Sequence, residues 1–102
     1  MIQRLTLDAK SDLREACRWY RRQVPGLDRE FLRCFEVCLA SVDRYPESQP
    51  IVHGRLRRAP LRRFPYAVFY FLRADMLVVV AVLHTYRDPK TLLGRERSPL
   101  AE

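Results

Sequence analysis

Side chains able to bind anions or to move protons surround two apolar runs, Phe64–Leu72 and Met76–Leu83. Five arginines precede the first run, and a histidine, a tyrosine and an arginine follow the second: Arg55, Arg57, Arg58, Arg62, Arg63, His84, Tyr86 and Arg87. Both runs are rich in β-branched and aromatic residues, which predicts a β-hairpin. Because the outer ends of two antiparallel strands meet, we expect these arginines and the histidine at one edge of a sheet.

The net positive charge of the chain lies almost entirely in its second half. Residues 8–47 hold eight basic and eight acidic residues, whereas residues 48–102 hold ten basic and four acidic ones. Seventeen of the 19 basic residues are arginines, whose planar fork pairs bidentately with phosphates and carboxylates. The pattern predicts an acidic partner, and the alternative interpretation is a solvated basic face with an arginine bias.

Length and composition indicate one globular domain over residues 1–102. The longest uncharged apolar runs have eight or nine residues, far below the ~20 that span a bilayer. The first ten residues contain no long apolar core, so we expect no secretory signal, no membrane association and a cytoplasmic location.

Cysteines and histidines do not form a metal-binding pattern in this sequence. Cys17, Cys34 and Cys38 are odd in number and lack a C-x-x-C spacing, so we interpret them as structural thiols. His53 and His84 are too few and too distant in sequence to complete a site with them. We therefore expect neither a metal nor a cofactor.

The first half of the chain predicts two helices that follow a short edge strand over Ile2–Leu7. Apolar residues at helical spacing predict one helix over Ala9–Arg22, with Asp8 as its N-cap, and a second over Asp28–Tyr45, with Asp28 as its N-cap. The connection is short and contains Pro25-Gly26, which favours an antiparallel helix pair.

The second half predicts an irregular strand within Ile51–Leu61, ending near Pro60, and two regular strands over Arg62–Arg73 and Asp75–Tyr86. In the first regular strand, Phe64, Tyr66, Val68, Tyr70 and Leu72 should share one face, and Ala67, Phe69 and Phe71 the other. In the second, we expect Val78, Val80 and Val82 to oppose Leu77, Val79, Ala81 and Leu83.

Both faces of these strands are apolar, so the helices should cover one face, and the tail of the chain or a partner should cover the other. Lys90–Arg97 is long enough for one or two helical turns. The predicted fold is α+β, with an N-terminal helical hairpin packed on a small antiparallel sheet of about 3–4 strands and a short C-terminal helix.

Five sequence pieces occur in an order that resembles the RelE/ParE superfamily of bacterial toxins, and specifically its ParE-like branch. They are A-x-x-D-L-x-E-A-x-x-W-Y (residues 9–20), P-G-L (25–27), E-F-L (30–32), R-R-F-P-Y (62–66) and V-L-H-x-x-R-D-P (82–89), with Arg95 after the last. The resemblance covers roughly Leu7 to Arg95 and implies the same arrangement of helices and strands.

The resemblance also implies a partner, a cognate ParD-like antitoxin whose acidic C-terminal segment wraps around the toxin. Exposed apolar strands and arginines suit the coupled folding of such a segment. The residues expected to bind the antitoxin or the cellular target are Arg55, Arg57, Arg58, Arg62, Arg63, Tyr66, Arg87 and Arg95.

Two activities occur in the superfamily. ParE-like members poison DNA gyrase by binding, whereas RelE-like members cut messenger RNA on the ribosome and need a proton acceptor, cations and an acid. The arginine that RelE-like members carry in the central strand falls at Ala67, and their C-terminal tyrosine falls at Thr91 or Leu92. ParE-like members frequently carry tryptophan where this chain has Leu92.

The sequence therefore favours a gyrase inhibitor without chemistry of its own. The first alternative is a ribosome-dependent endoribonuclease that uses His84 as acid or base, with Arg62, Arg63 and Arg87 around the phosphate. The second is a degenerate toxin that acts only as a basic interaction module.

Overall fold

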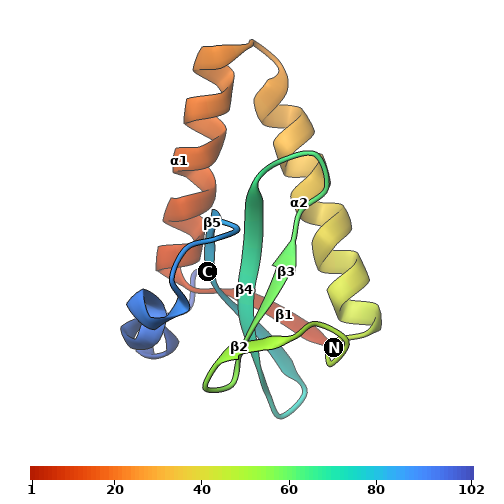
Figure 1. Cartoon of the computed structure of the whole chain (residues 1–102), viewed down its shortest axis with the longest axis vertical. Coiled ribbons are helices and arrows are strands. Elements are labelled where there is room, and N and C mark those ends of the chain that lie inside the picture. The colour runs from red at the N-terminus through yellow and green to blue at the C-terminus, as the bar shows by residue number, and fades with distance from the viewer.

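The computed structural model describes residues 1–102 and confirms the α+β class, with a helical hairpin packed on a sheet (Figure 1). The elements are β1 (Ile2–Leu5), α1 (Leu7–Gln23), α2 (Leu27–Arg44), β2 (Ile51–His53), β3 (Leu56–Pro60), β4 (Tyr66–Arg73), β5 (Met76–His84) and the 3₁₀ helix η1 (Pro89–Arg97). The sheet has five strands in the order β1-β5-β4-β3-β2. No helix is long and apolar enough to cross a membrane.

The sheet is larger than the predicted three to four strands, and it is mixed. β1 pairs in parallel with β5, because α1 and α2 carry the chain away before it returns, while the other neighbours are antiparallel. The irregular strand predicted within residues 51–61 divides into β2 and β3 at a turn that contains Gly54, whose φ of 58° is left-handed.

Both helices begin earlier than predicted. Thr6, not Asp8, is the N-cap of α1, and its Oγ1 accepts a hydrogen bond from the Ala9 N–H at 3.1 Å. Asp8 instead lies in the first turn, where its negative charge suits the helix dipole. Asp28 likewise lies in the first turn of α2, whose N-cap is Gly26 with a φ of 96°.

A β-bulge in β5 changes which face of the sheet its last residues occupy, compared with the prediction. Phe69 pairs with Ala81 and Tyr70 with Val79, so Val80 is an extra residue without a partner on β4. The alternation along β4 is as predicted, but beyond the bulge Val82 joins Val79 on the helix side. Ala81 and Leu83 join Val78 and Val80 on the other side. The predicted faces are therefore correct from Leu77 to Val80 and wrong for Ala81, Val82 and Leu83.

Each face of the sheet has its own apolar core. The helix side buries a large cluster that includes Phe31, Phe35 and Tyr70. On the opposite side, Phe69, Phe71 and Val80 pack with Leu92 of η1 and with Leu100. The tail of the chain therefore covers this face, and the sheet does not leave it open for an antitoxin.

One ion pair fastens η1 to the bulge. The Asp12 carboxylate of α1 accepts hydrogen bonds from the Arg95 guanidinium and, at 3.1 Å, from the Val82 N–H, while Arg95 also donates to the Val80 carbonyl at 3.2 Å. β1 ends at Leu5, which pairs with Val79 of β5. The Val80 carbonyl and the Val82 N–H lie beyond that point, and Arg95 and Asp12 provide their hydrogen-bond partners. Burial raises the pKa of Asp12, although its hydrogen bonds to Arg95 and Val82 oppose that shift.

Candidate functional site

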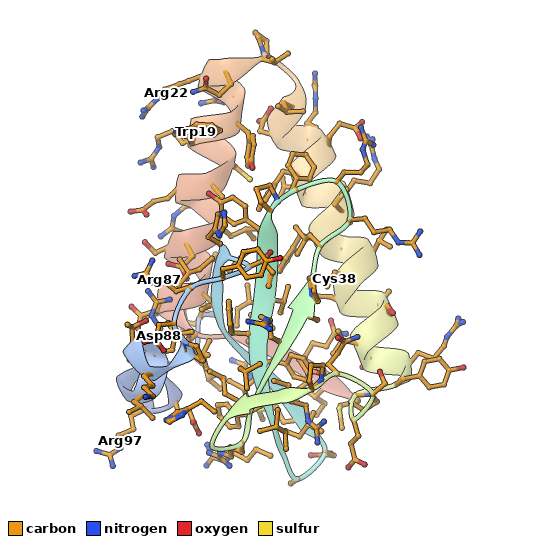
Figure 2. The ribbon with its side chains drawn as sticks, viewed as in Figure 1. Trp19, Arg22, Cys38, Arg87, Asp88 and Arg97 are labelled. Atoms are coloured by element: carbon orange, nitrogen blue, oxygen red, sulfur yellow. The ribbon has the colours of Figure 1, made fainter.

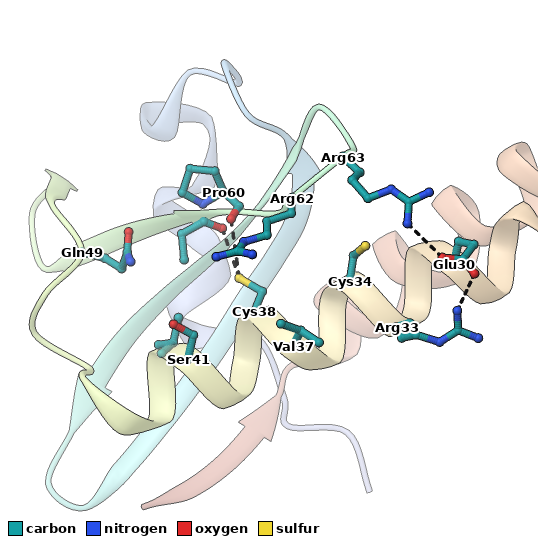
Figure 3. Close-up of a pocket in the computed structure, with 12 residues that line it drawn as sticks. Glu30, Arg33, Cys34, Val37, Cys38, Ser41, Gln49, Pro60, Arg62 and Arg63 are labelled. Atoms are coloured by element: carbon teal, nitrogen blue, oxygen red, sulfur yellow. Dashed lines mark hydrogen bonds and ion pairs between the residues drawn. The ribbon is translucent and has the colours of Figure 1, made fainter.

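A groove lies between α2 and β3, with a volume of about 370 Å³ (Figure 3). Its floor combines the sulfur atoms of Cys34 and Cys38 with apolar side chains, and its rim is charged. The lining residues are Glu30, Arg33, Cys34, Val37, Cys38, Ser41, Val42, Gln49, Ala59, Pro60, Arg62 and Arg63. We call this hollow the α2–β3 groove.

The rim of the α2–β3 groove carries three cations and one carboxylate. Glu30 accepts hydrogen bonds from Arg33 and, at 3.2 Å, from Arg63, whereas Arg62 makes no ion pair. Arg63 has a left-handed φ of 71°, in the turn between β3 and β4. Because the single carboxylate is already shared by two arginines, the rim keeps an excess of positive charge.

The groove contains two free cysteines, Cys34 and Cys38. The Cys38 Sγ donates to the Ala59 carbonyl at 3.6 Å, and burial raises its pKa to about 11. Burial also raises the pKa of Cys17, and none of the three cysteines is in a disulfide. A protonated thiol is a poor nucleophile, so Cys38 is poorly suited to covalent chemistry. The chain contains no group of three His, Cys, Asp or Glu side chains that could hold a metal.

The structure brings only part of the predicted arginine set together. Residues at the end of β3, the start of β4 and the end of β5 share one end of the sheet, because Tyr66 pairs with His84 and the Thr85 N–H bonds to the Pro65 carbonyl. We call this region the arginine end. It contains Arg58, Arg62, Arg63, Tyr66, His84 and Arg87.

Arg55 and Arg57 do not belong to the arginine end, contrary to the expectation from the sequence. They lie where β3 begins, and β3 runs toward the arginine end, so its first residues are at the opposite end of the sheet. Arg55 pairs with Glu96 at 2.6 Å and stacks on the Phe71 ring at 4.0 Å. Arg57 donates to the carbonyls of Glu47 and Gln49.

Two further predicted binding residues also have contacts within the chain. Arg58 donates to the Thr85 carbonyl at 3.2 Å, which ties β3 to the end of β5. Arg95 is the partner of buried Asp12. Arg62 and Arg87 therefore remain as exposed arginines of the predicted set without an ion pair, while exposed Arg63 is paired with Glu30 (Figure 2 shows Arg87 beside Asp88).

His84 lies exposed at the end of β5. Its Nδ1 accepts a weak hydrogen bond from the Tyr86 N–H at 3.4 Å, and its ring centroid lies 6.4 Å from that of Tyr66. No carboxylate hydrogen-bonds to the imidazole. Ala67, at the position of the RelE-like arginine, is fully buried. The geometry supplies cations and an imidazole but no third group that orients the imidazole.

Sequence reasoning missed the α2 side of the groove. Glu30, Arg33, Val37 and Ser41 form a polar and apolar stripe along α2, next to the stripe that includes Phe31 and Phe35. Val37 is 57% exposed, which is unusual for valine. The available signal was a valine outside the apolar stripe of α2, one turn from Arg33 and one turn from Ser41.

The fold is that of a small α+β domain, and comparisons with known proteins place it among the toxins of type II toxin–antitoxin systems. The family model described as "ParE toxin of type II toxin-antitoxin system, parDE" matches residues 4–89. The chain belongs to the ParE toxin family.

A solved structure has the same fold. It is described as the chromosomal ParDE toxin–antitoxin system from P. aeruginosa, and its TM-score is 0.74 at 13% sequence identity. The match covers 83% of this chain and 96% of that chain. No curated protein sequence matches this chain.

Proposed function

We propose that this ParE-type toxin acts by binding DNA gyrase and is neutralised by a cognate antitoxin. The proposed binding of the antitoxin is supported by the α2–β3 groove, which has an apolar floor and a rim with more arginines than carboxylates. An amphipathic acidic segment complements both features, because its apolar side chains bury the floor while its carboxylates meet Arg33 and Arg62.

The edge of β3 favours side-chain docking over strand addition. The Arg58 N–H is already bonded to the Pro50 carbonyl, and Pro60 has no N–H to offer. An incoming strand would therefore find few free donors along this edge. The antitoxin segment is proposed to lie in the groove as a helix or an irregular chain.

Antitoxin docking can be tested by reversing the charge of the rim. The toxin and the antitoxin from the adjacent gene would be purified, and their affinity measured for Arg62→Glu and for the matched control Arg73→Glu, which changes an exposed arginine at the other end of β4. We expect Arg62→Glu to weaken binding about tenfold or more, as the loss of a charge-assisted pair predicts. Equal affinities for the two variants would contradict the proposed docking site.

The proposal that the toxin has no catalytic activity is supported by Ala67 and by the environment of His84, which lacks an orienting carboxylate. The alternative nuclease would use His84 with Arg62, Arg63 and Arg87. Inducing the chain in cells without antitoxin, and comparing plasmid supercoiling with cleavage of ribosome-bound transcripts, separates the two. Transcript cleavage that His84→Ala abolishes would contradict gyrase inhibition, and unaffected growth would indicate a degenerate toxin.

A further inference from the structure

A second hollow lies beside the other helix, between α1 and the ends of β4 and β5, with a volume of about 440 Å³. Its lining includes the aromatic side chains of Trp19, Tyr20 and Tyr66 together with His84 and the carboxylates of Asp12 and Glu15. We call it the aromatic hollow. It opens where β1 has ended and β5 has no further neighbouring strand.

The aromatic rings form a continuous wall. Trp19 meets Tyr20 edge-on with centroids 5.0 Å apart, Tyr20 lies 5.8 Å from Tyr66, and Tyr66 lies 6.4 Å from His84. Trp19 is 51% exposed on α1, so its ring is accessible from solvent (Figure 2). The negative faces of such rings attract cations.

Two oxygen-bearing side chains of the aromatic hollow, Tyr20 and Glu15, lack a hydrogen-bond or ion-pair partner within the chain. Tyr20 is only 8% exposed, yet its hydroxyl makes no hydrogen bond within the chain, and Glu15 is exposed and makes no ion pair. Asp12, in contrast, is already paired with Arg95. Burial raises the pKa of Tyr66, and the negative charges of Asp12 and Glu15 raise it further, which indicates a negative potential at its hydroxyl.

This local charge is opposite to that of the molecule. The chain has a formal net charge of +7, but no arginine or lysine lines the aromatic hollow. A phosphate placed there would lie near the unpaired Glu15 carboxylate, whereas a guanidinium could donate to Glu15 and to the phenol oxygens while stacking on Trp19.

We propose that the aromatic hollow binds an arginine side chain presented by a partner protein. The inference rests on the hollow alone and requires neither gyrase nor the α2–β3 groove. Its test and the test of the proposed function can therefore fail separately. A cationic probe is informative for a chain of net charge +7, because general electrostatic attraction would favour anions.

Trp19 is the only tryptophan of the chain and reports on the hollow directly. N-acetyl-arginine methylamide would be titrated into the full chain while the Trp19 fluorescence and its indole N–H resonance are recorded. The matched neutral probe is the citrulline derivative, which has nearly the same shape without the charge. We expect saturable binding of the arginine probe and a response to citrulline that is weaker by about tenfold.

Two variants test where the arginine probe binds. Glu15→Gln should lower the affinity for the probe about tenfold. Glu36→Gln changes an exposed carboxylate on α2 and should leave that affinity unchanged. Equal responses to arginine and citrulline would overturn the proposal. So would resonance shifts centred on Arg62 and Arg63, no saturable change at Trp19, or tighter binding of adenosine monophosphate than of the arginine probe, which would point to nucleic acid.

Discussion

The ion pair between Asp12 and Arg95 offers the most quantitative test of how this fold is held together. Asp12→Ala removes the acceptor for the Val82 N–H and for two guanidinium nitrogens, one of them 3.3 Å from Oδ1. Breaking a buried pair in this way costs about 3–5 kcal/mol. Because the Arg95 side chain is 24% exposed and can regain water, we expect about 3 kcal/mol.

Asp12→Asn separates the hydrogen bonds from the charge. Since burial outweighs the ion pair and raises the pKa of Asp12, the negative charge is disfavoured on balance by the folded state. The asparagine oxygen can still accept a hydrogen bond, so this variant should lose only about 1 kcal/mol. The raised pKa means that the folded state holds the Asp12 proton more tightly than the unfolded state does. The contribution of Asp12 to stability is therefore largest below its ordinary pKa of 3.8, and it falls as the pH rises through the raised pKa.

The assay is urea unfolding followed by circular dichroism. With a slope of about 2 kcal/mol per molar urea, a loss of 3 kcal/mol lowers the midpoint by about 1.5 M. The double variant Asp12→Ala with Arg95→Ala should lose less than the sum of the two single losses, because the two side chains share one network. Strictly additive losses, or an Asp12→Ala variant no less stable than Asp12→Asn, would refute the reasoning.

Three further variants test other parts of the fold. Thr6→Ala should lower the free energy of unfolding by about 1 kcal/mol in urea, because it removes the N-cap of α1, while Thr6→Ser should not. Leu92→Ala should lose about 2–5 kcal/mol and increase the binding of a hydrophobic dye, because η1 then covers the sheet poorly, whereas Leu93→Ala changes an exposed side chain and should have little effect. Burial raises the pKa of Tyr70 to about 12, so wild-type stability should fall as the pH rises from 10 toward 12, and Tyr70→Phe should remove that part of the fall when unfolding is compared at the two pH values.

Features set by local sequence were predictable, and those set by distant contacts were not. The apolar stripes of both helices and the alternation along β4 follow directly from residue spacing. Thr6 and Asp8 are both good N-cap residues, and the end of β1 decides between them. The bulge at Val80 falls within a run of valine and alanine that gives no sign of an extra residue.

The candidate site shows the same division. The position of Arg62 and Arg63 near the start of β4 was predictable from the hairpin, but the reversal of the chain at Gly54 sends Arg55 to the far end of the sheet. The pairing of Asp12 with Arg95 joins residues that are 83 positions apart, and neither residue carries a local signal for it. The aromatic hollow likewise combines α1 with the ends of two strands.

We have proposed that this ParE-type toxin acts on gyrase by binding and without chemistry of its own. The most direct measurement is supercoiling of relaxed plasmid by purified DNA gyrase in the presence of the wild-type chain and of His84→Ala. We predict that both proteins inhibit supercoiling to the same extent. Unaffected supercoiling, together with cleavage of ribosome-bound messenger RNA that His84→Ala abolishes, would contradict the claim.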